Sequence, residues 1–466
     1  MLAVSVAATL PLGAYAASPA LVPGLAAAAV ALVAILRRPE LGIAVALTLA
    51  PLTNFTFGGD FKPFQLLLPA LAFGLLVYGA LVVDSKPLAY SRWLTVGVAV
   101  FACAAVIASI AAEDPGATVR KLVIVLTAAA LYFAVLTICR DRRKLLTVVG
   151  GALAGLLLAA AQGVVQYYFG IFSGVGFLID GSLVVRVQGS FGHPNQYAGY
   201  LAFLIPLAGS VAVRNRFSPG LRWLAAAGIA LALPALVFSF TRGAILALVL
   251  GSLLWLALLR PRAALLVGVA IAVLSVAFAP ATLKERFDPQ KGKGDVPLRA
   301  DIWEAAVDIY ATRPVFGVGL NNFPNAYASL PTTLSTGSQR RLLEHEALII
   351  PPHAQNLYLN VLAEQGIVGF AALALLAAAA LLVLYRGAHV TDAAGRIVAL
   401  ATGAGVFAIG VHSVLEVTLL SELALPLFAL LAVVAGFVAL EYERRELEDA
   451  YLVTTTDARP ASPAAS

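Results

Sequence analysis

Charged residues are scarce in this chain of 466 residues, where Asp, Glu, Lys and Arg together make up 12%. Hydrophobic residues make up 61%, and the mean hydropathy is +0.92. This balance excludes a soluble globular protein, because so much apolar surface exceeds what a single core encloses. The composition therefore predicts a polytopic membrane protein.

Cysteine is also rare, with only Cys103 and Cys139 in the chain. Both lie in or at the end of apolar runs and far apart, so we predict neither a disulfide framework nor a cysteine metal site. No His/Asp cluster has the spacing of metal ligands, and we expect no metal and no other cofactor. A basic n-region is missing before the apolar stretch 2–17, which we interpret as a membrane span.

The net charge of +6 does not require a nucleic-acid partner. The basic residues form short clusters between apolar segments, as the positive-inside rule expects for cytoplasmic connections. These clusters occur at every second connection: Arg37–Arg38, Lys86 with Arg92, Arg140–Lys144, Arg214 with Arg216 and Arg222, Arg260 with Arg262, Arg386 with Arg396, and Arg444–Arg445. The pattern predicts that both termini are cytoplasmic.

Fourteen apolar segments follow one another: 2–17, 20–36, 41–53, 64–83, 93–112, 122–139, 145–169, 196–213, 223–240, 243–259, 263–280, 357–385, 397–413 and 420–440. Most reach the roughly 20 residues of a transmembrane helix, and only 41–53 is clearly short. We therefore predict an all-α polytopic membrane protein with 12–14 transmembrane helices. Its predicted parts are an N-terminal bundle 1–280, a large external loop 281–356, C-terminal helices 357–440 and a disordered cytoplasmic tail 441–466.

The external loop, 76 residues long, carries eight basic and eight acidic residues, so it has no net field to attract anions. Within it, Asp295 is a helix cap and Pro297 suits the first turn of a helix that runs to about Ala311. The glycine-rich stretch Phe316–Asn322 resembles a turn and lacks the flanking strand and helix of a phosphate loop. A loop of this length usually carries function.

The helix predicted in this loop is amphipathic. At about 100° per residue, one face carries an arginine and two aromatic residues and the opposite face carries acids. Such a helix can lie along the membrane surface as a lid over the bundle, or pack within a small core of the loop itself. The two faces are Arg299, Trp303 and Tyr310 against Asp301, Glu304 and Asp308.

A polar seam is predicted where this loop returns to the membrane, in Pro351 to Gly369. Two prolines predict the N-terminal turn of a helix, and at about 100° per residue four polar side chains share one stripe. Polar groups lined up in a membrane helix indicate a functional site, although packing against other helices is the alternative. The stripe consists of His353, Asn356, Asn360 and Glu364.

Arginines gather on the same outward side of the membrane. Arg186 precedes a predicted span, Arg242 lies in an outward hairpin, and Arg299 lies on the amphipathic helix. Each alone is explained by snorkelling or an ion pair, but together they favour an anionic ligand, because guanidinium groups match phosphate oxygens. His193 is a further candidate on this side, His412 and Glu416 are expected to complete the wall of a cavity, and His345 and His389 to face solvent.

Four motifs occur in order between about residues 180 and 425: Arg186 with Gly-Ser-Phe-Gly-His-Pro-Asn-Gln-Tyr197, Ser239-Phe-Thr-Arg-Gly-Ala244, Arg299 to Gly319, and His353 to Gly369. Together they resemble the O-antigen ligase and polymerase superfamily. The resemblance implies an inverting, metal-independent membrane glycosyltransferase. Such an enzyme moves a glycan from an undecaprenyl-diphosphate carrier to an acceptor hydroxyl on the outer face of the bacterial inner membrane, among membrane lipids and without a nucleotide sugar.

Residue roles follow from the same resemblance. Arg186, Arg242 and Arg299 are expected to hold the diphosphate, and His353 to accept the proton of the incoming hydroxyl. A place for His353 in the first turn of a helix would favour its neutral form. The remaining expected substrate contacts are Asn356, which can orient the imidazole or a sugar hydroxyl, Trp303 or Tyr310, which can stack on a sugar or the carrier, and His193 and Glu364.

The acceptor stays open at this point. An O-antigen ligase, which uses the lipid A core, is our first prediction, and polymerases and protein O-oligosaccharyltransferases share these motifs. A flippase or transporter of lipid-linked sugars is the alternative outside the enzymes. It is expected to show inverted repeats and helices broken near mid-bilayer, whereas here the polar residues gather at one face beside a large loop.

Overall fold

The structure is a computed structural model, and it describes residues 35, 37–56, 62–83, 92–110, 112–171, 175–179, 182–259, 262, 295–330 and 350–457. The predicted spans 2–17 and 263–280, most of 20–36, and His345 lie outside these residues. Eleven of the fourteen predicted apolar segments lie within them, and each corresponds to a helix.

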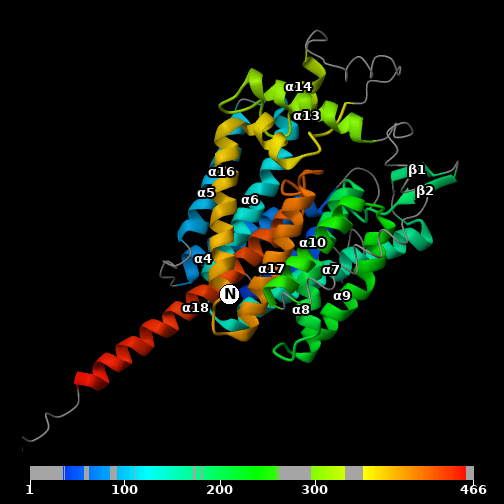
Figure 1. The fold of residues 1–466 in the computed structure, drawn as a ribbon. Helices are drawn as coiled ribbons and strands as arrows, with labels where there is room; N and C mark the ends of the chain where they lie inside the picture. Colours follow the sequence, from blue (N-terminus) through cyan, green and yellow to red (C-terminus); the bar gives the residue numbers. More distant parts are fainter. Residues whose placement is uncertain are drawn as a thin grey trace, which may run out of the picture.

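These helices form one bundle (Figure 1). They are α3 (Pro39–Leu49) with the 3-10 turn η1 (Ala50–Leu52), α4 (Phe64–Val82), α5 (Arg92–Ile110), α6 (Pro115–Ile138), α7 (Arg142–Phe169), α8 (Pro194–Ala212), α9 (Pro219–Phe238), α10 (Arg242–Leu259), α16 (Leu357–Gly387), α17 (Ala393–His412) and α18 (Ala424–Asp457). Within the described ranges, eight helices are long and apolar enough to cross a membrane. The predicted all-α membrane class is confirmed.

Local sequence signals explain several helix boundaries. The caps are acidic or hydroxyl side chains that accept a hydrogen bond from a backbone N–H of the first turn, which satisfies a donor without an intrahelical partner. They are Asp114 for α6, Asp141 for α7, Ser218 for α9 and Asp392 for α17. Helix α7 ends at Gly170, whose φ of 64° is a conformation that glycine adopts without strain.

The connections between helices lie at two ends of the bundle. One end, called the loop end here, carries α13 (Asp295–Thr312), α14 (Phe323–Ser329) and a hairpin of β1 (Val175–Ile179) and β2 (Ser182–Arg186) (Figure 1). The strands are antiparallel, with Val175 opposite Arg186. At the opposite end, Arg142 of one basic cluster donates to Asp392 at 2.9 Å. Arg142 also donates to Arg216 O, so three of the predicted basic connections share this end, which we still predict to be cytoplasmic.

Helix α18 lies at the centre of the bundle and then leaves it (Figure 1). Its residues 424–439 are buried, whereas 443–449 are exposed. The helix continues to Asp457, so the prediction of disorder from residue 441 is wrong for 441–457. Ion pairs across one helical turn, from Arg444 and Arg445 to Glu441, stabilise this extension.

Helix α13 packs against both α14 of the loop and α16 of the bundle. Ile302, Ala305 and Ile309 are buried together with Phe323 and Tyr327 of α14 and Ala363 of α16. The helix therefore shares its core with the bundle, so the loop does not enclose it alone. The predicted wet face is partly wrong, because Asp301 is buried at 9% exposure and follows the packed face rather than the acidic one.

Helix α16 begins later than predicted. Asn356 is its N-cap and accepts hydrogen bonds from the backbone N–H of Tyr358 at 2.9 Å and of Leu359 at 3.1 Å. The predicted start at Pro351 is wrong, because a capping asparagine has extended backbone geometry and precedes the first helical residue. His353 consequently lies in the chain before the helix, and the four predicted seam residues do not share one helical stripe.

A break at Gly366 interrupts α16, with φ 64° and ψ −165°. Backbone groups on both sides of the break bond to the glycine-rich turn: Gly319 N–H donates to Glu364 O at 2.9 Å, and Ile367 N–H donates to Pro314 O at 2.8 Å. These bonds replace those that the helix loses, which a membrane segment requires. The break therefore fixes the external loop onto the bundle.

Replacing Gly366 with alanine is expected to destabilise the protein strongly. The backbone there lies in a region that glycine alone adopts easily, at a cost of about 1–3 kcal/mol for other residues, and a Cβ atom would collide with Val315 O. Thermal unfolding of the detergent-solubilised protein should show a clearly lower Tm. Gly403→Ala is the matched control, because a Cβ there meets no atom within 4 Å. Equal Tm values for the two variants would contradict this account.

Candidate functional site

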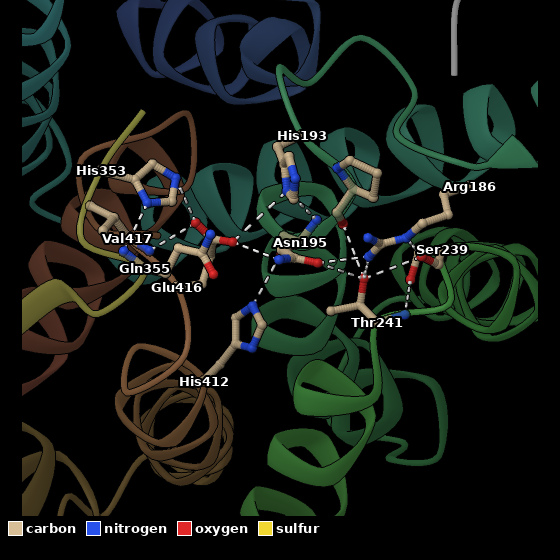
Figure 2. A network of polar contacts seen from close by, with 11 residues as sticks. Arg186, His193, Asn195, Ser239, Thr241, His353, Gln355, His412, Glu416 and Val417 are labelled. Carbon is tan, nitrogen blue, oxygen red and sulfur yellow. Dashed lines mark hydrogen bonds and ion pairs between the residues drawn. The ribbon is translucent and has the colours of Figure 1, made fainter. Parts of the chain in front are cut away.

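Glu416 is the centre of a polar network at the loop end (Figure 2). It lies between α17 and α18, and its side chain is only 1% exposed. Oε1 lies 3.0 Å from His353 Nε2 and accepts from Val417 N–H at 3.0 Å, and Oε2 accepts from Asn195 Nδ2 at 2.7 Å. A buried carboxylate with three donors is well satisfied, so it can remain charged.

His353 has both ring nitrogens engaged. Nδ1 accepts the backbone N–H of Gln355 at 3.1 Å, so the ring proton lies on Nε2 and points to Glu416. A carboxylate on one ring nitrogen orients the imidazole and stabilises its protonated form, as in hydrolytic triads. The pair Glu416–His353 is therefore built to take up a proton, although not through the helix dipole that the sequence suggested.

The charge of Glu416 depends on its neighbours. Burial alone would raise the pKa of its carboxyl, but the charge and hydrogen bond of His353, then the charge of His193 and the N–H of Val417, outweigh burial. The result is a pKa held well below the ordinary 4.5. Glu416 is therefore an ionised partner for His353 at neutral pH rather than a proton acceptor itself.

His193 caps α8 and lies on the other side of Glu416 (Figure 2). Its Nδ1 accepts the N–H of Asn195 at 3.2 Å and lies 3.8 Å from Glu416 Oε2. Burial lowers the pKa of His193 below 6.5; the charge of Glu416 acts in the opposite direction, and the positive charges of Arg186, His353 and Arg299 lower it further. The surroundings of His193 therefore favour its neutral form.

Asn195 connects this pair to Arg186. Its amide nitrogen donates to Glu416, and its amide oxygen accepts from Arg186 Nη2 at 2.7 Å. Arg186 also donates to Thr241 Oγ1 and Ser239 O, each at 3.0 Å. The amide of Asn195 therefore joins the guanidinium of Arg186 to the carboxylate of Glu416. No role was predicted for this asparagine from the sequence.

The other two predicted arginines lie close by. Arg242 is exposed and begins α10, directly after Thr241 in the network. Arg299 is half-buried on α13, near enough for its charge to act on His193. The structure thus brings the three arginines and two histidines of the predicted site to one end of the bundle.

A cavity of about 190 Å³ opens beside the two histidines. Its lining includes His193, His353, Asn360, Glu364 and Lys121. Lys121, whose Nζ donates to Leu420 O at 2.8 Å, was missed because it lies near the start of α6 with no motif around it. The lining contains no predicted arginine among the described residues.

Several predicted contacts have structural partners instead. Glu364 accepts the N–H of Phe323 at 3.2 Å and so holds α14 against α16. Asn360 accepts the N–H of Ala354 at 3.0 Å, next to His353. Asn356 caps α16 and does not orient the imidazole, and Trp303 and Tyr310 are half-buried on α13 outside the cavity lining.

His412 and Glu416 were expected to form part of a cavity wall. His412 is buried and its Nε2 donates to Asn195 O at 3.1 Å, so it supports the asparagine from behind. Glu416 is more than a lining residue, because its carboxylate contacts both His353 and Asn195. In the sequence, Glu416 is an acidic residue just after the predicted outward end of an apolar helix. Such a position indicates a functional site, but it does not show which residue the carboxylate contacts.

Removing the charge of Glu416 is expected to change stability in a pH-dependent way. A carboxyl whose pKa is lowered on folding contributes stability that is complete above its ordinary pKa of 4.5 and is lost as pH falls below it. The Tm of Glu416→Gln should therefore lie below wild type at pH 7 and approach it in acid. The exposed Glu443→Gln should follow wild type throughout. A difference that grows towards low pH would refute this assignment.

The fold and the site define a polytopic membrane protein with a buried carboxylate–imidazole pair and several arginines at one end of its bundle. Residues 225–374 of the 466 match the family model described as O-antigen ligase, which supports the predicted resemblance to the O-antigen ligase and polymerase superfamily. The matched segment contains Arg242, Arg299 and His353, while Arg186 and Glu416 lie outside it. A comparison with curated proteins found no match.

Proposed function

We propose that the protein transfers a glycan from an undecaprenyl-diphosphate carrier to an acceptor hydroxyl at the outer face of the bacterial inner membrane, as an O-antigen ligase with the lipid A core as acceptor. The match of residues 225–374 to the O-antigen ligase family model supports a membrane glycosyltransferase of the O-antigen ligase or polymerase type. The observation that carries the proposal is the contact of 3.0 Å between His353 Nε2 and the buried Glu416. In this topology both termini are cytoplasmic and the loop end faces outward.

The pair supplies the base. The acceptor hydroxyl replaces the N–H of Gln355 at His353 Nδ1 and gives its proton to the ring, while Glu416 stabilises the imidazolium through Nε2. The hydroxyl oxygen then bonds to the anomeric carbon as the carbon–oxygen bond to the diphosphate breaks. A single displacement of this kind inverts the anomeric centre.

The arginines stabilise the leaving group. The diphosphate departs with the bonding electron pair, and preorganised cations lower the energy of that charge as it forms. Arg242, exposed at the start of α10, and Arg299, half-buried on α13, are the groups that we assign to the diphosphate oxygens. Arg186 holds the Asn195 side chain in place through a hydrogen bond and adds positive charge to the network.

Purified protein in detergent, supplied with the lipid-linked glycan, tests this function. Lipid A core, a second carrier-linked unit and a Ser/Thr-rich protein are offered separately as acceptors. We expect transfer to the lipid A core, at an unchanged rate when a metal chelator is added. Product on the carrier-linked unit alone would identify a polymerase, and product on the protein alone a protein O-oligosaccharyltransferase. Because detergent solution has no compartments, absence of all products would favour a flippase.

A further inference from the structure

A second, larger cavity adjoins the one beside the histidines. It has a volume of about 410 Å³, and Lys121, Gly192, Gln196 and Asn321 line both cavities. The described residues that line it include none of Arg186, Arg242 and Arg299. A transfer reaction brings two substrates together, and the chain thus has space next to His353 that the leaving group does not require.

The charged residues that line this cavity are mostly basic. Lys62, Arg120 and Lys121 line it together with Asn54 and Glu422. Asn54 Nδ2 donates to Glu422 Oε1 at 2.6 Å, which fixes the carboxyl from one side. Three cations around one carboxyl leave a net positive lining, which suits an anion.

Glu422 carries a second indication of a ligand. Its side chain is buried, and Oε2 has no hydrogen-bond partner within the described part of the chain. Burial raises the pKa of this carboxyl, and backbone and Asn54 donors and the charges of Lys121 and Lys62 only partly oppose the rise. A protonated carboxyl can donate from Oε2, and a buried donor without a partner is a group that a ligand oxygen satisfies.

Apolar residues make up much of the remaining lining of this cavity. Leu66, Leu68 and Pro69 of α4 lie on one side, and Val123 and Ile124 of α6 lie on the other. Leu66 is 68% exposed on a helix that is long and apolar enough to span the membrane, so this side of the cavity borders the lipid region. A cationic head region joined to an apolar channel matches an amphiphile with an anionic head group.

We propose that this second cavity binds the acceptor substrate, a phosphorylated amphiphilic glycan carrier, through Lys62, Arg120 and Lys121. The inference rests on the proposed function and specifies its acceptor side. The phosphoryl group lies against the cations, Glu422 donates to one of its oxygens, and the acyl or prenyl chains follow α4 and α6. Lys121, common to both cavities, holds the head group next to His353. The phosphate belongs either to a lipid A core or to a second carrier-linked unit.

The double variant Lys62→Gln/Arg120→Gln tests this site, because both residues line the second cavity alone. Loss of two phosphate contacts is expected to raise KM for the phosphorylated acceptor about tenfold or more. KM for the glycan donor and kcat at saturating acceptor should stay near wild type. The matched control is Arg214→Gln/Arg216→Gln, two exposed arginines at the opposite end of the bundle.

The two phosphorylated acceptors are compared with the same lipid A core after phosphatase treatment. A rise in KM for lipid A core or for the carrier-linked unit identifies the source of the phosphate. An unchanged KM, an equal rise for the dephosphorylated glycolipid, or transfer to the protein acceptor alone would overturn the proposal.

Binding measured without turnover separates this proposal from the proposed function. Native mass spectrometry of His353→Ala protein should detect bound phosphorylated glycolipid, and the same protein carrying Lys62→Gln/Arg120→Gln should lose most of it. That result supports the acceptor site even if transfer itself fails in every assay. Equal binding by the two proteins would refute the site, whatever the activity of the wild type.

Discussion

His353→Ala is expected to lower the rate of glycan transfer by about 10²–10⁴-fold, the contribution of a positioned general base. The alanine removes the only group that takes the hydroxyl proton in the proposed reaction, and it leaves the buried carboxylate of Glu416 without its nearest imidazole. The measurement is kcat for glycan transfer by purified protein at saturating donor and acceptor. Binding of the lipid-linked donor should be retained, because the base does not hold the diphosphate.

The exposed His389, at the opposite end of the bundle, provides the control for this prediction. His389→Ala should transfer glycan at the wild-type rate. Transfer at the wild-type rate by His353→Ala as well would exclude His353 as the base and, with it, the mechanism. Equal elution volumes and Tm values for the two variants show that any difference arises from chemistry rather than folding.

Arg299→Ala should be the second most damaging change, with kcat reduced about 10²–10³-fold, as for other preorganised groups that stabilise a developing charge. Arg299 is half-buried and its charge acts on His193, so it lies near the proposed base, where a cation can stabilise the departing diphosphate. Arg299→Lys should recover only part of the rate, because an ammonium group lacks the planar fork that matches two phosphate oxygens. Single-turnover kinetics with the lipid-linked donor measures these effects.

Arg313 belongs to the same external loop and serves as the matched control. It pairs with Glu113 at 3.3 Å, and both side chains are about half exposed, so the pair adds little to stability. Arg313→Ala should therefore retain the wild-type rate. If both alanine variants lose the same activity, the loss reflects loop folding, and the assignment of Arg299 to the diphosphate is wrong.

Glu416 changes how the site is understood. The histidine and the arginines are the groups that the sequence motifs contain, but the structure joins His353 to Arg186 through a carboxylate and an amide that lie 221 residues apart. Arg186, Asn195, Glu416 and His353 form one continuous chain of contacts (Figure 2). A substitution at Asn195 should therefore affect the arginine side and the histidine side together.

Much of the architecture could be predicted from the sequence, because its signals are local. Apolar runs predicted the bundle helices that the described residues contain, and Asp114, Asp141 and Asp392 are local caps of α6, α7 and α17. The motifs around Arg242, Arg299 and His353 lie in the segment that matches the O-antigen ligase family model. The alternation of basic clusters placed these residues on one side, and the structure brings them to one end.

The sequence by itself determined the membrane class, the order of the helices and the end of the bundle at which the chemistry gathers, since hydropathy and charge act over one helix length. Only the tertiary structure decided that Glu416 binds His353 and that Asp301 is buried. Each of these depends on a partner brought near by helix packing across the bundle, and no local pattern specifies which distant residue that partner is.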